Sequence, residues 1–102
     1  MSLFAGEERR RSSRLPSKRP LLIFVVGGDP RPITAFTFSI STFGCAARCA
    51  TDIAPGTRVL LDCDGKRMEG TVSFVLKNSA LEGFELGIAF AQDGCEFWGT
   101  MF

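Results

Sequence analysis

The sequence predicts an all-β domain, built as a small barrel of six antiparallel strands. Two observations carry this prediction: apolar and polar residues alternate along most of the chain, and turn-forming residues interrupt the alternation at regular intervals. Such alternation is typical of strands that bury one face and expose the other, as in antiparallel sheets. Six short strands with short loops favour a closed barrel, because closure removes exposed sheet edges.

Each expected strand ends at such an interruption. Gly27–Pro30 separates the first two apolar runs, Ala54–Gly56 ends another segment, and Asp64-Gly65 predicts a tight hairpin. The expected strands, with ends placed to within ~2–4 residues, cover 18–27, 31–40, 43–51, 57–63, 66–77 and 83–91. After them we expect at most one short helical turn, with Phe97 and Trp98 packing on the barrel.

Alternation also assigns the strand faces. In FTFSI, the apolar residues Phe36, Phe38 and Ile40 are expected to face the core, which sends the hydroxyl groups of Ser39 and Ser41 to the outer face. In MEGTVSFVL, the residues expected on the buried face are Met68, Val72, Phe74 and Leu76.

The chain is about one domain long, at 102 residues, and its 45% hydrophobic content predicts a packed core. Residues 1–20 carry six Lys/Arg and two Glu, whereas residues 21–102 carry six Lys/Arg and nine Asp/Glu. We therefore divide the chain into a flexible basic arm, residues 1–17, and a barrel domain, residues 18–102. An anion is the expected partner of the arm.

Several classes of function lack the residues that they need. The chain has no His, which excludes Ser-His-Asp and Cys-His mechanisms. The glycines of Gly27–Pro30 lead into another expected strand and not into a helix, so they do not form a phosphate-binding loop. We therefore expect no enzymatic activity and no cofactor.

The cysteines Cys45 and Cys49 lie four residues apart in an expected strand, ~13 Å at ~3.3 Å per residue. That distance is too long for a shared zinc ion or for a disulfide, although the same spacing on a helix would suit a metal. Cys45, Ala47 and Cys49 share one face of the strand, which favours thiols that pack as small apolar groups. We expect no metal site.

The longest apolar run is LLIFVV, Leu21–Val26. It falls well short of the ~20 residues of a membrane span and of the ~7–15 residues in the apolar part of a signal peptide. We expect a buried strand, no membrane insertion and a cytoplasmic location.

Two motifs occur in order. Arg10–Arg14 fits R-x-x-x-R, and Ser39–Gly44, with the sequence SISTFG, approximates [D/N]-x-S-x-x-G. Taken alone, the second is more typical of a polar turn, and the first is often a solvated basic tail. Their combination with the later segments PGTRVLLDC and FELGIAF resembles the PilZ family of bacterial cyclic di-GMP receptors, from Arg9 to Phe90. The resemblance implies the split barrel of that family.

The resemblance also implies roles for single residues. Arg10 and Arg14 would grip the dinucleotide, Ser41 would form a hydrogen bond with it, and Gly44 would keep the turn open.

Ser39 departs from the pattern, because the family usually has Asp or Asn at this position. A hydroxyl cannot make the bidentate contact that a carboxylate makes with a guanine edge, which typically lowers discrimination by ~1–3 kcal/mol. Arg9 and Arg11 would add charge attraction.

The leading hypothesis is therefore a non-enzymatic cyclic di-GMP receptor. Its ligand would order the basic arm and so alter a surface that contacts an unidentified protein partner. The alternative is a degenerate PilZ-like protein–protein interaction module that does not bind the nucleotide. Binding of RNA or single-stranded DNA ranks lower, because such surfaces interleave exposed aromatic and basic residues. The Phe residues here are expected to face inward, so we expect no DNA or RNA partner.

Overall fold

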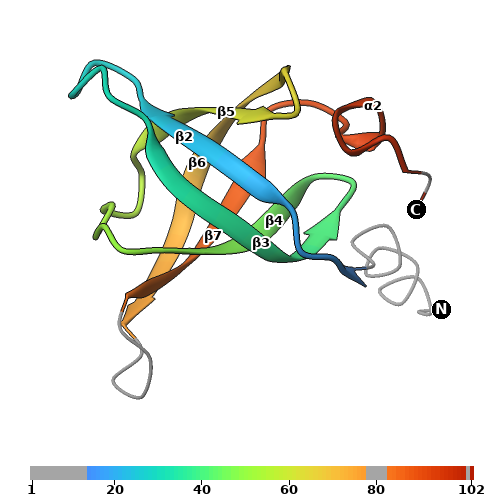
Figure 1. The fold of residues 1–102 in the computed structure, drawn as a ribbon, viewed down its shortest axis with the longest axis horizontal. Coiled ribbons are helices and arrows are strands. Elements are labelled where there is room, and N and C mark those ends of the chain that lie inside the picture. The colour runs from blue at the N-terminus through green and yellow to red at the C-terminus, as the bar shows by residue number, and fades with distance from the viewer. Residues whose placement is uncertain (1–13, 78–82, 101) are drawn as a thin grey trace, which may run out of the picture.

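The computed structural model describes residues 14–77, 83–100 and 102 (Figure 1). Its elements are β1 (Leu15–Pro16), β2 (Pro20–Val25), β3 (Ile33–Ser41), β4 (Gly44–Cys49), β5 (Arg58–Cys63), β6 (Lys66–Lys77), β7 (Phe84–Phe90) and a short helix, α2 (Cys95–Trp98).

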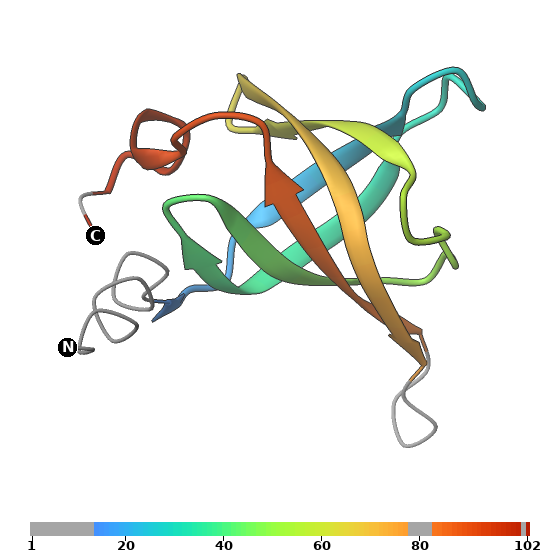
Figure 2. The same ribbon diagram turned by 180° about the vertical axis from the view of Figure 1, so that it is seen from behind.

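The strands β2 to β7 form a closed barrel. Around the barrel the order is β2, β3, β4, β7, β6 and β5, and β5 pairs again with β2. All of these pairings are antiparallel, and Figure 2 shows the same barrel from behind. The predicted all-β, six-stranded antiparallel barrel is therefore confirmed. The two-residue strand β1 was not predicted; it pairs with the end of β3, beyond the residues of β3 that pair with β2.

The tight hairpin predicted at Asp64-Gly65 joins β5 to β6. Both residues have positive φ angles, 54° and 84°, and the flanking Cys63 and Lys66 are paired. Two such residues form the turn whose twist matches that of the adjoining strands. Asn, Asp and Gly tolerate this backbone conformation best, which is why the dipeptide predicts the turn.

Small side chains from β4 fill the barrel next to larger ones from β7. Cys45, Ala47 and Cys49 are buried, as alternation predicted, and the thiols are free. Leu86 and Ile88 of the neighbouring strand are buried beside them. The expectation that these thiols pack as apolar core groups is confirmed.

A β-bulge between Thr37 and Ser39 corrects the predicted faces of β3. Thr37, expected outside, is fully buried, whereas Phe36, expected inside, exposes 41% of its surface. The extra residue of the bulge, Phe38, resets the alternation, so that Ile40 is buried as predicted. The prediction that Phe36 and Phe38 face the core was wrong.

A second β-bulge changes which side chains of β6 face the core. A bulge between Val72 and Phe74 leaves Met68 and Val72 in the core as predicted, but it turns Phe74 and Leu76 outward. These two residues were also assigned to the wrong face. A single inserted residue inverts every side chain that follows it, because the period of a strand is two.

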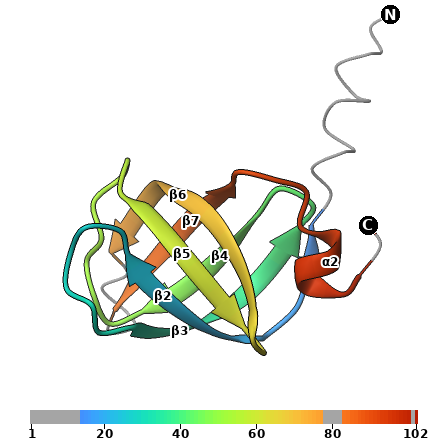
Figure 3. The same ribbon diagram turned by 90° about the horizontal axis from the view of Figure 1, so that it is seen from above.

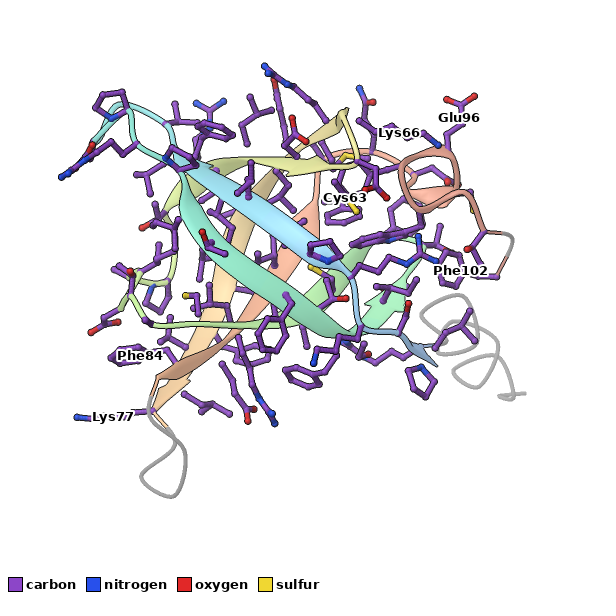
Figure 4. The ribbon with its side chains drawn as sticks, in the orientation of Figure 1. Cys63, Lys66, Lys77, Phe84, Glu96 and Phe102 are labelled. Carbon is purple, nitrogen blue, oxygen red and sulfur yellow. The ribbon has the colours of Figure 1, made fainter. Side chains whose placement is uncertain are left out.

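The short helix α2 lies against the end of the barrel next to the β3–β4 turn (Figure 3). Phe97 and Trp98 are buried and pack against Phe90, with ring centroids 5.6 Å from that ring. Lys66 extends from the β5–β6 hairpin and donates to the Glu96 carbonyl oxygen at 3.0 Å (Figure 4). The predicted helical turn and its packing are confirmed.

Candidate functional site

The pairing of β1 with β3 brings the end of the first motif to the start of the second. Leu15 lies opposite Ile40, and Pro16 lies opposite Ser39. In this register, the Arg14 Nη1 group donates to the Ser39 Oγ at 3.5 Å, at the exposed surface. Two predicted site residues that are 25 positions apart in the chain are therefore neighbours.

The bond between Arg14 and Ser39 is long for a hydrogen bond and is exposed to water, so it is weak. A guanidinium group held in this way keeps most of its donors available for an incoming anion. Arg9, Arg10 and Arg11 lie outside the described residues, and their roles stay predictions.

Ser41 is placed differently from Ser39. Its side chain is buried, at 6% exposure, and its Oγ donates to the Gly44 carbonyl oxygen at 3.3 Å. The Ser41 carbonyl oxygen accepts a hydrogen bond from the Trp98 Nε1 at 3.0 Å. The hydroxyl therefore serves the turn itself, and the prediction that it lies on the outer face was wrong.

Gly44 is required by strand packing. A Cβ atom at this position would lie 2.4 Å from the Ile88 carbonyl oxygen on β7, so any side chain here would force the backbone to shift. Two hydrogen bonds from other segments also hold the β3–β4 turn. The Gly94 N–H donates to the Thr42 carbonyl oxygen, and the Phe90 N–H donates to the Phe43 carbonyl oxygen. A role of Gly44 toward a ligand stays a prediction.

Beside Arg14 and Ser39 lies a groove that the sequence reasoning missed. It has a volume of about 370 Å³ and is lined by Pro16, Ser17, Lys18, Phe36, Thr37, Phe38 and Arg48. The Lys18 Nζ lies 4.8 Å from the centroid of the Phe36 ring, and the Arg48 Cζ lies 4.8 Å from that of Phe38. The β3 bulge creates this surface, because it turns both aromatic rings outward.

This groove removes one argument against nucleic acid. Inward-facing Phe residues would offer no stacking surface, whereas the rings of Phe36 and Phe38 lie on the outside of the barrel beside cationic groups. The expectation of no DNA or RNA partner stays a prediction. A sequence signal was present, since Ala35 and Phe36 are both apolar and leave the direction of the alternation ambiguous.

The thiols contribute no reactive centre to this surface. Burial raises the pKa of the Cys45 thiol to about 12, so it stays protonated at neutral pH. Among residues 14–77, 83–100 and 102, no three His, Cys, Asp or Glu side chains gather closely enough to hold a metal ion. Within the same residues, no helix has the length and apolar character needed to cross a membrane.

No protein-family model and no curated protein matches this sequence. Among solved structures, the inhibitor of motility MotI/DgrA of Bacillus subtilis matches with a TM-score of 0.70 at 15% sequence identity. The match covers 89% of this chain and 46% of that protein, so the chain spans about half the length of its structural neighbour. At this identity the likeness shows the fold alone, a PilZ-like barrel.

Proposed function

We propose that this PilZ-like barrel is a non-enzymatic receptor for cyclic di-GMP, and that the ligand binds beside Arg14 and Ser39. The observation that carries the proposal is the β1–β3 pairing, which seats an exposed guanidinium group next to the hydroxyl of the second motif. Arg10 and Arg14 would hold the dinucleotide, with Arg9 and Arg11 adding attraction. The change in the arm would alter the surface offered to a protein partner.

The chemistry of the ligand suits this arrangement. Cyclic di-GMP carries two phosphates and two guanines, and the planar fork of arginine matches both phosphate oxygens and the O6/N7 edge of guanine. The long bond between Arg14 and Ser39 joins a cation to a neutral hydroxyl group, and it is easily exchanged for a bond to phosphate, in which both partners are charged.

Calorimetric titration with cyclic di-GMP tests the proposal. The wild-type protein should bind the dinucleotide, and Arg14→Ala should weaken binding by about tenfold or more, because a bond to a charged group contributes about 1.5–3 kcal/mol. Arg58→Ala is the matched control, since Arg58 is an exposed arginine on β5, which is not adjacent to β3. Absence of heat at high micromolar ligand would defeat the proposal.

A second candidate is a PilZ-like module that contacts a protein partner without nucleotide. The burial of Ser41, whose hydroxyl is already used by Gly44, favours this candidate. So does the hydroxyl of Ser39 at a position where the family usually has a carboxylate or an amide. If this candidate is right, the wild type does not bind and Ser39→Asp creates binding. A Ser39→Asp variant that also fails to bind the dinucleotide would show that the serine at this position is not the reason for the absence of binding.

A further inference from the structure

The groove beside Ser39, lined in part by Phe36, Phe38, Lys18 and Arg48, has the features of a stacking site. We propose that it binds one guanine base of the dinucleotide, and that Arg48 reads the edge of this base. The inference rests on the proposed function and deepens it. It assigns a base-binding half to a site whose phosphate-binding half is Arg14.

The two rings offer a floor for a base. Phe36 exposes 41% of its surface, and each ring is covered on one face by a single cation, Lys18 on Phe36 and Arg48 on Phe38. An exposed contact between a cation and a ring is weaker than the stacking of a base on an aromatic side chain. A base that stacks on the rings therefore displaces the two cations. They then lie at the edge of the base and beside the phosphates of the dinucleotide.

The charges around the groove also favour an anionic ligand with a polar edge. Lys18, Arg48 and the neighbouring Arg14 are cationic, and Glu85 is the carboxylate that pairs with Arg48, at 3.3 Å. This pair uses the Arg48 Nη2, which leaves the Nη1 group to the ligand. A fork of this kind recognises the O6/N7 edge of guanine in preference to adenine.

Arg48 is also incompletely satisfied as it stands. Its Nε is buried and has no hydrogen-bond partner within the described part of the chain. A buried donor without an acceptor is costly, so a movement of the guanidinium group that gives this N–H a ligand acceptor is favourable.

Two phenylalanines of equal exposure provide a matched test. Phe36 and Phe74 each expose 41% of their surface, but Phe74 lies on β6, outside the groove. In calorimetric titrations with cyclic di-GMP, Phe36→Ala should weaken binding by about tenfold, as for the loss of one stacked base, whereas Phe74→Ala should bind like the wild type. Circular dichroism checks that both variants are folded.

The titrations separate failure of this inference from failure of the proposed function. If the wild type binds and Phe36→Ala binds equally well, the groove is not the base site, and the receptor function stands. If the wild type does not bind, both are overturned. Arg48→Lys should reduce the preference for cyclic di-GMP over cyclic di-AMP, and an unchanged preference contradicts the edge-reading role. A single-stranded oligonucleotide that binds more tightly than the dinucleotide would assign the groove to nucleic acid instead.

Discussion

At the scale of single residues, the two serines and the glycine of the second motif divide into one residue at the surface and two that the barrel itself uses. Ser39 is available at the surface beside Arg14, whereas Ser41 and Gly44 are used by the β3–β4 turn and by packing on β7. All three were predicted to lie at one site, because a motif gives positions along the chain and not the neighbours on other strands. The backbone of Ile88, which explains Gly44, is such a neighbour.

The contact at Gly44 predicts an asymmetry between two glycines. A Cβ at Gly44 would meet the backbone oxygen of Ile88 at 2.4 Å, whereas a Cβ at Gly87 would meet the ring of Phe74, an exposed side chain that can move away. Gly44→Ala should therefore lower the free energy of unfolding by ~1–3 kcal/mol, and Gly87→Ala by clearly less. At ~4–8 °C per kcal/mol for a domain of this size, thermal unfolding resolves the difference. Equal melting temperatures for the two variants would refute the packing role of Gly44.

At the scale of elements, the strands were predictable and their faces only in part. Every predicted strand is present in the structure. The strands could be predicted because turn residues such as Asp64-Gly65 mark their ends. The bulges next to Phe38 and Ser73 were not predictable, since they follow from pairing with β4 and β7. The strand β1 was missed because two residues, one of them Pro16, carry no alternation.

The helix α2 is held by contacts from distant parts of the chain. Trp98 Nε1 donates to the Ser41 carbonyl oxygen, and the Arg19 guanidinium donates to the Trp98 carbonyl oxygen and to the Thr100 Oγ1. Arg19 also lies over the Trp98 ring, at 5.7 Å. These contacts join α2 both to the start of β2 and to the turn of the second motif.

The bond from Trp98 to Ser41 can be tested by removing the indole N–H while keeping an aromatic ring. Trp98→Phe should lower the free energy of unfolding by about 1–2 kcal/mol, since a buried hydrogen bond is lost, and Trp98→Ala should cost about 3–5 kcal/mol. Denaturant unfolding followed by circular dichroism is the suitable measurement, because Trp98 is the only Trp and its fluorescence is lost in both variants. A Trp98→Phe variant as stable as the wild type would contradict the anchoring role of this bond.

At the scale of the whole molecule, the two ends of the barrel differ. One end carries β1, the β3–β4 turn and α2, and there Arg14 lies beside Ser39 of the second motif (Figure 1). The opposite end has an open hollow of about 580 Å³, whose lining includes Asp29, Arg31, Thr51 and Asp52. Asp29 and Arg31 pair with each other at 2.8 Å, which lowers the pKa of the carboxyl group and leaves that end less suited to an anion.

The location of binding is the central claim, and nuclear magnetic resonance tests it most directly. On addition of cyclic di-GMP to the isotope-labelled protein, we expect amide shifts to concentrate at Arg14, Leu15 and Ser39, with those of Thr51 and Asp52 unchanged. Shifts confined to the Thr51–Asp52 end, or no shifts at saturating dinucleotide, would contradict the account.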